Sequence, residues 1–519
     1  MNKNIKNIIF RAPYTKLLNA ILLASLAICG SGCSGDSGKT SSDGKNIQVA
    51  TGTIIGFGSV IVNGIRFTRK GGLADDRVKL GFENNSSASE QNLRVGMIVK
   101  VTGTIDAATD TGEYESIEFQ PEIRGPLDTG GVDTAAGTLT IMGRKVQIDT
   151  NTNFENIRDL TEIGSELQAE RQPELEISGN LDNATGILHA TRVARKADDF
   201  NALPDKVVQI KGEISNANIA GGSFNIGSVT VKLDTAALGA GTVRADIADG
   251  AVFEVKGTLN GTAITAINVE KKAAVEAMMN SLVCIKGTAT GGIDDKTLTI
   301  NGPNGAITVN ASAASFQIGD ASATSAIAAA GASVEVEGVL QPDGSIAATR
   351  VYTETERTVK LEGNALAGAF NATASTLTLN GVKMDITATT RLVANKGKAL
   401  DLANIATGDH LQIVGLFDGN TGKVKASQVQ VTTASTDTFI QGPVTAAAAP
   451  NLTLIGTISV DTSHVDQTLN FLDDRNVTPV KFGSRAAFFA AVKTDGLTTV
   501  RAVGSLTGTS LSATKVLLE

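Results

Sequence analysis

The chain has 519 residues, with 45 lysines and arginines against 53 aspartates and glutamates, so its formal net charge is −8. No nucleic-acid partner is expected, because binding to phosphates depends on a surplus of basic side chains. Aromatic residues make up only 4% and tryptophan is absent, which disfavours sites that stack on bases or sugars. The length exceeds one hydrophobic core and predicts several domains.

Residues 1–33 have the features of an export signal. Four basic residues precede the apolar run "LLNAILLASLAICGSGC", which is too short to span a bilayer comfortably. They are Lys3, Lys6, Arg11 and Lys16. Gly32 and Ser31 precede Cys33, and the segment resembles a bacterial lipoprotein signal, which implies lipidation of Cys33 as the first mature residue. Ordinary signal cleavage and an uncleaved anchor are the alternatives.

The segment after the signal, residues 34–48, is rich in glycine and serine and predicts a flexible tether. The resemblance to lipoproteins implies an exported, lipid-anchored protein of the bacterial cell envelope, and Ser34 after the cysteine is compatible with sorting to an outer membrane. The membrane is then a partner through the N-terminal lipid.

The motif "GFGSVIVNGIRF", residues 56–67, looks at first like a nucleotide loop. The dinucleotide fingerprint requires a third glycine three residues after the second and a helix behind it, but Ile61 stands at that place. The apolar residues 59–62 and the Asn63-Gly64 pair instead predict two strands joined by a hairpin turn.

Three glycine signals recur in the same order six times along the chain, at intervals of about 73 to 87 residues. The first lies in a β-rich run, as in "IKGEI", the second in a turn, and the third in a run such as "LEISG". The first signals are Gly52, Gly125, Gly212, Gly287, Gly363 and Gly442. The second are Gly64, Gly143, Gly227, Gly302, Gly381 and Gly456. The third are Gly103, Gly179, Gly257, Gly338, Gly415 and Gly504.

Most units have helix-forming residues between the second and third glycines, at 158–167, 322–331, 398–408 and 484–496, with Ser484 as a plausible N-cap. A last strand follows the third glycine. One unit therefore has the order β-β-β-α-β-β, which predicts an all-β fold with minor α content, a tandem array of six small OB-like five-stranded β-barrels. The alternative is a chain of small β-sandwiches, for which the repeat is short.

The predicted domains follow this frame. They are the signal peptide 1–33, the tether 34–48, and repeats at 49–122, 123–206, 207–282, 283–357, 358–436 and 437–519.

The first unit, "GTIIGFGSVIVNGIRF" with "LRVGMIVKVTGTID", resembles a domain-of-unknown-function family, family 5666, found as tandem OB-like repeats in exported bacterial lipoproteins. The resemblance is closest over residues 49–128 and weaker in the other units. It implies a module and a cellular address but no reaction, and no catalytic or ligand residue is transferred.

Candidate site residues are few and scattered. His189, His410 and His464 fall in different units without paired-histidine spacing, so no triad or metal site is predicted. Cys284, the one cysteine after the signal, lies among strand-forming residues and is expected to be a buried structural thiol. The aspartates at 292–297 and 472–476 lack the ligand alternation of a calcium loop and predict solvated turns.

Arg192, Arg350 and Lys515 recur at one position of the last strand. They form either a basic row for an anionic ligand or, more simply, a strand face that balances nearby acids.

These observations favour a non-catalytic envelope lipoprotein that acts as a structural or interaction array, like a spacer or adhesin, without cofactor or metal. The alternative is an OB-like module that binds an envelope oligosaccharide or another ligand. The expected partners are the membrane and an envelope polysaccharide or protein.

Overall fold

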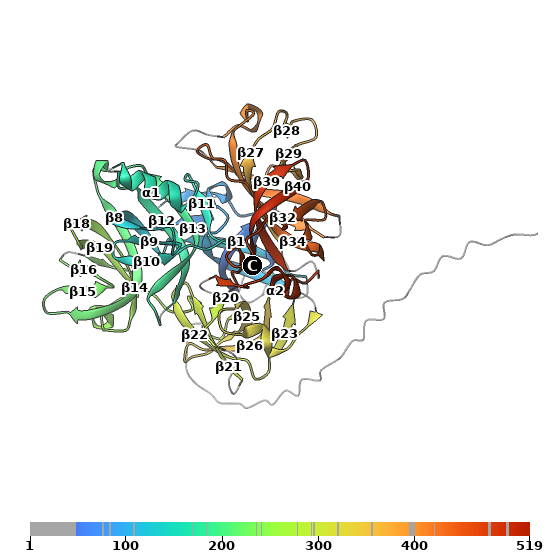
Figure 1. Ribbon diagram of the computed structural model, residues 1–519. Coiled ribbons are helices and arrows are strands. Elements are labelled where there is room, and N and C mark those ends of the chain that lie inside the picture. Colours follow the sequence, from blue (N-terminus) through green and yellow to red (C-terminus); the bar gives the residue numbers. More distant parts are fainter. Residues whose placement is uncertain are drawn as a thin grey trace, which may run out of the picture. The chain divides into compact units, whose positions relative to one another are not determined.

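The computed structural model describes residues 48–519 except 75–76, 83–84, 107–108, 170, 183, 235, 240, 278, 292, 294–295, 319–320, 354–356, 394–399, 420, 476–478 and 495–497. This part of the chain consists mainly of β-strands, and its only α-helices are α1 (Leu160–Gln168) and α2 (Arg485–Ala491) (Figure 1). The prediction of an all-β fold with minor α content is confirmed. The signal segment and the predicted lipidation site at Cys33 lie outside the described residues.

The first strands of the described chain close into a small barrel. They are β1 (Gln48–Gly56), β2 (Val60–Val62), β3 (Ile65–Arg69), β6 (Ile98–Asp106) and β7 (Thr111–Phe119). β1 pairs antiparallel with β2 and β6, β2 pairs with β3, and β6 pairs with β7. β3 runs parallel to β7 and completes the ring. Residues 56–67 therefore form strand, turn and strand, as predicted.

The same closed order of five strands recurs in further sets. One set is β8 (Ile123–Asp133), β9 (Thr138–Ile141), β10 (Arg144–Gln147), β12 (Glu174–Asp182) and β13 (Ile187–Ala197). Another is β14 (Val207–Asn218), β15 (Ser223–Ile226), β16 (Val229–Lys232), β18 (Val252–Asn260) and β19 (Ala263–Lys271). A third is β20 (Leu282–Ala289), β21 (Thr297–Gly302), β22 (Gly305–Asn310), β25 (Ser333–Leu340) and β26 (Ile346–Thr353). The last is β34 (Phe439–Ala448), β35 (Asn451–Leu454), β36 (Ile458–Asp461), β39 (Thr499–Thr507) and β40 (Ser510–Leu518).

One set has the same order without full closure. Its strands are β27 (Arg357–Asn364), β29 (Thr376–Leu379), β30 (Val382–Asp385), β32 (His410–Asp418) and β33 (Lys423–Val431). The pairings run from β29 through β30, β33 and β32 to β27. Among the described residues no ladder joins β27 to β29, which pairs instead with β28 (Phe370–Asn371).

Each set bulges at the third glycine of the sequence pattern. In β6 the register shifts between Thr102 and Gly103, and a Cβ on Gly103 would lie 2.1 Å from the carbonyl oxygen of Glu113 on β7. The other five glycines come equally close to a carbonyl of the strand that follows, at 2.0–2.7 Å. They are Gly179, Gly257, Gly338, Gly415 and Gly504, each at a register shift. The absence of a side chain therefore permits the bulge that bends the strand.

The helix predicted in most units is only partly present. α1 and α2 form where Asp159 and Ser484 cap them by accepting from the backbone N–H of Glu162 and Ala487. The predictions at 322–331 and 398–408 were wrong, since the described residues of these segments form no α-helix, and their helical structure is limited to the 3₁₀ turns η4 (Ser325–Ala328) and η5 (Leu402–Asn404). η4 lacks a capping hydrogen bond from Thr324, and Ile405, Thr407 and Gly408 follow η5, all poor helix formers.

Short strands that the sequence did not predict lie between the third and fourth strands of the sets and pair in parallel with the last strand. They are β4 (Val78–Leu80), β11 (Asn153–Glu155), β17 (Ala237–Leu238), β23 (Ser315–Ile318), β31 (Arg391–Val393) and β37 (Phe471–Asp473). The remaining short elements are β5 (Asn85–Ala88), β24 (Ala321–Ser322), β38 (Val480–Lys481), η1 (Glu90–Asn92), η2 (Phe200–Ala202) and η3 (Arg244–Asp246).

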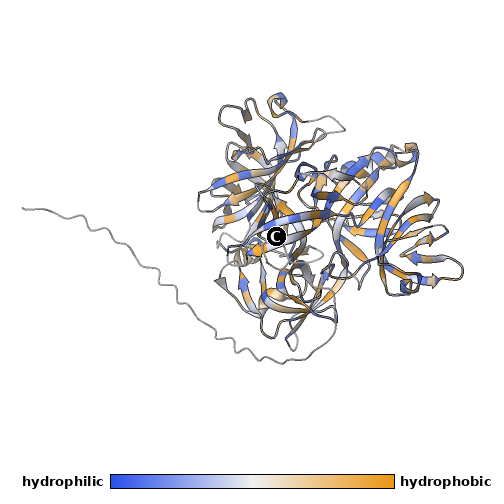
Figure 2. Cartoon of the chain, turned by 180° about the vertical axis from the view of Figure 1, so that it is seen from behind, coloured by the Kyte–Doolittle hydropathy of each residue, from blue (hydrophilic) through white to orange (hydrophobic). Residues whose placement is uncertain are grey.

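The five-stranded sets are joined in pairs by backbone hydrogen bonds between their first strands. β8 pairs antiparallel with β14, β27 pairs antiparallel with β34, and β1 runs parallel to β20. Hydrophobic and hydrophilic residues alternate along many strands (Figure 2), as in β22, where every second residue is buried. The β8 to β19 strands share one hydrophobic cluster, and the β27 to β40 strands share another.

Candidate functional site

Three of the sets contribute to the lining of a cavity of about 270 Å³. Its walls come from the segment between β10 and α1, from β27, β32 and β33, and from the starts of β34 and β39. Leu361, Ile413, Val414 and Val503 give it apolar surface, together with Phe154 and Phe439. The polar lining includes carboxylates, guanidinium groups, a lysine and three glutamines.

Lys360 on β27 is buried and holds the loop beside the cavity. Its Nζ donates to the carbonyl oxygens of Thr150 at 2.9 Å, Asn151 at 2.6 Å and Thr152 at 3.3 Å. Burial, and secondarily the charge of Arg501, lower the pKa of Lys360 to about 7. Its hydrogen-bonding capacity is used within the protein, so it anchors the loop rather than offering a free cation.

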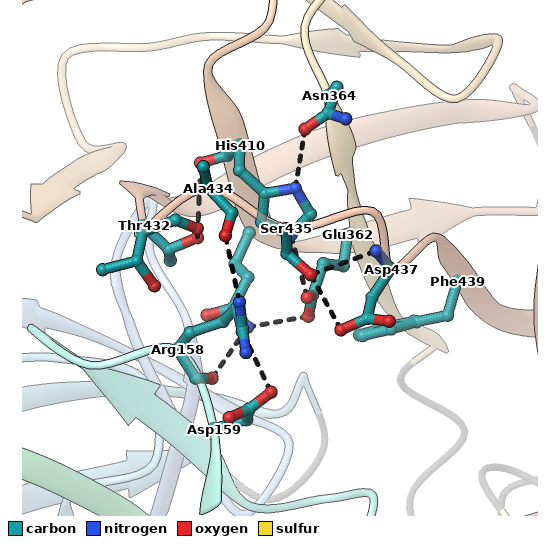
Figure 3. A network of polar contacts seen from close by, with 12 residues as sticks. Arg158, Asp159, Glu362, Asn364, His410, Thr432, Ala434, Ser435, Asp437 and Phe439 are labelled. Atoms are coloured by element: carbon teal, nitrogen blue, oxygen red, sulfur yellow. Dashed lines mark hydrogen bonds and ion pairs between the residues drawn. The ribbon is translucent and has the colours of Figure 1, made fainter. Parts of the chain in front are cut away.

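A histidine-centred network lies at the β27 to β32 ladder (Figure 3). His410 has no exposed side-chain surface, and its ring nitrogens contact Asn364 Oδ1 at 2.8 Å and Glu362 Oε1 at 2.9 Å. Gln412 Nε2 donates to the other Glu362 oxygen at 2.7 Å and to the Arg158 carbonyl at 2.8 Å. The carboxylate of Glu362 is therefore satisfied on both oxygens.

Arg158 and Asp437 come from segments far apart in sequence. The Arg158 guanidinium donates to Asp159 at 3.0 Å and to the Ala434 carbonyl at 3.3 Å (Figure 3). Asp437 is exposed and accepts a hydrogen bond from Ser435 Oγ at 2.8 Å. This part of the lining is closer to solvent than Glu362.

Arg501 on β39 also lines the cavity. Its guanidinium donates to Gln441 Oε1 from Nε at 2.9 Å and to the Thr150 carbonyl from Nη2 at 2.7 Å, and it lies over the Phe439 ring, 4.2 Å from the centroid. Burial lowers its pKa.

Two carboxyl groups meet one hydroxyl next to Arg501. Thr150 Oγ1 contacts Asp474 Oδ2 at 2.6 Å and also contacts Glu519 Oε2. A hydroxyl has one proton to donate, so one carboxyl group must itself carry a proton for both contacts to be hydrogen bonds. Burial raises the pKa of Asp474 and raises that of Glu519 to about 7, which agrees with this geometry.

A second cavity, of about 110 Å³, is lined mainly by paired charges. Lys211 contacts Glu122 at 2.8 Å, and Lys100 contacts Glu118 at 2.8 Å. Lys272 lies within 3.3–3.6 Å of three carboxylates. This hollow is a network of ion pairs rather than an open site.

The three histidines do not converge, as predicted. His189 lies on β13, His464 is exposed in the loop after β36, and His410 begins β32. Sequence reasoning missed the Glu362 and His410 pair. The sequence does contain a sign of this pair. The residue before the first glycine of a unit is basic in three units, as Arg124, Lys211 and Lys286, but it is the acidic Glu362 before Gly363.

The recurring basic residues of the last strand each face acids. Arg192 is 1% exposed and contacts Glu155 at 2.5 Å and Glu176 at 2.9 Å. Arg350 contacts Glu337 at 3.1 Å and Asp110 at 3.3 Å. The charge of Asp474 acts on Lys515, although burial lowers the pKa of that lysine. The expectation that this face balances nearby acids fits these contacts, but the Arg192 position is buried rather than solvated.

Cys284 is buried, as predicted. Its Sγ lies 3.3 Å from the Tyr352 hydroxyl, its carbonyl accepts from Asn63 Nδ2 at 3.1 Å, and burial raises its pKa to about 12. A thiol with such a pKa stays protonated and is a poor nucleophile.

The prediction of a solvated turn at 472–476 was wrong for its first residues, since Leu472 and Asp473 end strand β37, which pairs with the edge of β40. Asp473 pairs with Arg475 at 2.6 Å, while Asp294 and Asp295 lie outside the described residues. In the part of the chain that the structure covers, no group of three or more His, Cys, Asp or Glu side chains is placed to hold a metal ion. Over the same residues, no helix combines the length and the apolar character needed to cross a membrane.

The model of the family described as "Domain of unknown function (DUF5666)" matches residues 124–194, 286–352 and 369–430. These segments contain β8 to β13, β20 to β26 and β28 to β33 in large part, whereas the sequence resemblance was placed most closely at 49–128. No curated protein matches the chain significantly.

Proposed function

We propose that this chain, which carries tandem domains of the DUF5666 family, is a non-enzymatic lipoprotein of the bacterial cell envelope that serves as an interaction scaffold. It is exported, lipidated at Cys33 and held at the membrane, with the outer membrane as the expected location. Its body is an array of six OB-like repeats, each with the strand order 1-2-3-5-4.

One observation supports this proposal most directly: polar residues at equivalent positions of different repeats form hydrogen bonds that connect one repeat to another. Gln412 and Arg501 occupy the same place, three residues before the third glycine. Each donates both to a partner in its own repeat, Glu362 or Gln441, and to a carbonyl oxygen of the segment between β10 and α1. Hydrogen bonds shared in this way fix one repeat against another.

Lys211 makes the same kind of link. It lies directly before the first glycine of its unit and bridges Glu122 at 2.8 Å and Asn304 Oδ1 at 2.7 Å, both in other repeats. Polar strand residues that connect the repeats in this way hold the repeats at fixed spacing. A protein of this kind can bind several partners, or several sites of one partner, at once, so that weak contacts add up to avidity.

A second candidate function is binding of an envelope oligosaccharide or another ligand. The polar cavity beside Glu362 and Gln412 favours it, since small-molecule sites combine apolar walls with a few placed polar groups.

The first proposal is tested with the Cys33→Ser variant in cells. We expect the wild-type chain to incorporate labelled palmitate, to sediment with the envelope and to cross-link there to a defined set of neighbours. The variant should lose label, sedimentation and cross-links together. Equal envelope association of both forms contradicts lipid anchoring, and the absence of any cross-linked neighbour in the wild type contradicts an interaction scaffold.

A further inference from the structure

From the chemistry of its lining we infer that the 270 Å³ cavity binds a neutral, hydroxyl-rich ligand, a saccharide unit. This inference rests on the second function proposed above and specifies both its place and its ligand class.

The charged groups of the cavity are already satisfied by the protein. Lys360 donates to three carbonyl oxygens, Glu362 is held by His410 and Gln412, and Arg158 contacts Asp159. An ionic ligand would have to displace these contacts or lie unpaired among charges of both signs. In either case the charged group of the ligand loses its hydration, and no free side chain of opposite charge compensates for that loss.

A neutral amide of the lining has a hydrogen-bonding nitrogen left over. Gln428 on β33 lines the cavity and is 4% exposed, and its Oε1 accepts from the backbone N–H of Val95 at 3.3 Å. That contact fixes the amide plane, and Gln428 Nε2 has no hydrogen-bond partner among the residues that the structure describes. A ligand hydroxyl is a suitable acceptor for this nitrogen, because each hydroxyl offers two lone pairs and one proton.

The neighbouring amides are held in place and extend the same surface. Gln430 Nε2 donates to the Ile157 carbonyl at 3.1 Å and lies 3.3 Å from Gln412 Oε1, while its own Oε1 accepts from the Asn156 N–H at 2.9 Å. Planar side chains fixed by such bonds can meet a hydroxylated ligand without losing further rotamer freedom.

The walls suit the other surface of a sugar ring. Val414 and Val503 are apolar, and Phe154 and Phe439 add aromatic surface, so the C–H face of a pyranose can pack while its hydroxyls reach the amides. Small-molecule sites have volumes of roughly 300–1,000 Å³, so a cavity of about 270 Å³ suits one or two sugar residues rather than a long chain.

The test is isothermal titration of the full-length protein with maltotriose and chitotriose, which are neutral, and with trigalacturonate, which is anionic. We expect at least one neutral trisaccharide to bind, with an affinity at least tenfold higher than trigalacturonate. Gln428→Met, which removes the amide at nearly constant volume, should weaken binding at least tenfold. Gln428→Glu, which keeps an acceptor for Val95 but lacks the amide donor, should also weaken it.

Gln341→Met is the matched control, because Gln341 lies outside the cavity and its side chain bonds, among the described residues, only the Val339 carbonyl. Neutral-sugar binding that both Gln428 variants leave intact overturns this site but not the ligand-binding function. Tighter binding of trigalacturonate overturns the ligand class. No binding of any of the three overturns the saccharide site and the oligosaccharide form of the second function, while the scaffold proposal stands on its own test at Cys33.

Discussion

The side chain of Asn63 lies directly over the α-carbon of Gly52, so that a Cβ at position 52 would come 1.8 Å from Asn63 Oδ1. Asn63 is the first residue of the β2 to β3 turn, with φ 52°, and it donates to the carbonyl oxygens of Thr51 and Cys284. The first and second glycine signals of the sequence are thus coupled, because the strand glycine makes room for the turn residue. Gly363 and Asn380 repeat this contact at 2.4 Å.

Gly52→Ala is expected to lower the free energy of unfolding by about 1–3 kcal/mol through overpacking against Asn63. In an Asn63→Gly background the obstructing side chain is gone, so the same substitution should cost much less. Urea denaturation of the two single variants and the double variant measures the coupling. Strictly additive effects would show that the two residues do not restrain each other.

The bulge glycines give an independent prediction. Gly504→Ala is expected to lower the free energy of unfolding by about 1–3 kcal/mol, since the new Cβ would lie 2.0 Å from the Ser512 carbonyl oxygen. Gly71→Ala is the control, because no atom lies within 4 Å of the added Cβ there. Thermal unfolding of both variants distinguishes them, and equal melting temperatures would remove the steric explanation.

The recurring glycine positions could be predicted from the sequence because each glycine is required by the local backbone geometry. Asn63-Gly64 requires positive φ at both residues, and Gly103 requires an approach that a Cβ blocks. The short strands such as β11 and β37 could not be predicted, since three residues carry no periodicity and depend on the edge of the last strand.

The strand pairings between the five-stranded sets and the candidate site could not be predicted from the sequence either. The pairing of β1 with β20 joins residues more than two hundred positions apart, and no local pattern specifies that partner. Gln428 and Arg158 meet in one cavity only through such long-range packing. Glu362 differs from the basic residues that precede the first glycine in other units, which the sequence shows, but its partner His410 follows only from the register of β27 and β32.

Arg192 provides a prediction about buried charge. Arg192→Met removes the buried guanidinium that both Glu155 and Glu176 contact and leaves these carboxylates with longer ion pairs, of 3.3 Å or more. We expect a loss of about 3–5 kcal/mol in the free energy of unfolding. Arg475→Met breaks an exposed pair with Asp473 and should cost less than about 1 kcal/mol. Chemical denaturation compares the two, and a loss at Arg192 no larger than at Arg475 would refute a structural role for the buried cluster.

The carboxyl groups at Thr150 predict a pH dependence. The pKa of Glu519 is about 7 in the folded chain against about 4.3 in an unfolded one, so its stabilising contribution is present below pH 4.3 and is lost as the pH rises through 7. Between pH 5 and 8 the wild type should therefore lose about 2–3 kcal/mol relative to Glu519→Gln, which cannot titrate. Urea denaturation at several pH values measures this difference, and parallel pH profiles would show that Glu519 ionises normally.

The shared ladders predict that a single repeat is not self-sufficient. Val359 and Leu361 on β27 belong to the same hydrophobic cluster as Ile440 and Val444 on β34, and the β27 ladder continues into β34. The fragment 355–435 would expose this face and leave the gap between β27 and β29 unsupported, because no ladder spans it among the described residues. We expect fragment 355–435 to lack a cooperative thermal transition and fragment 355–519 to have one, as measured by circular dichroism. A sharp transition for the shorter fragment would mean that the barrels fold independently and that the ladder forms between finished domains.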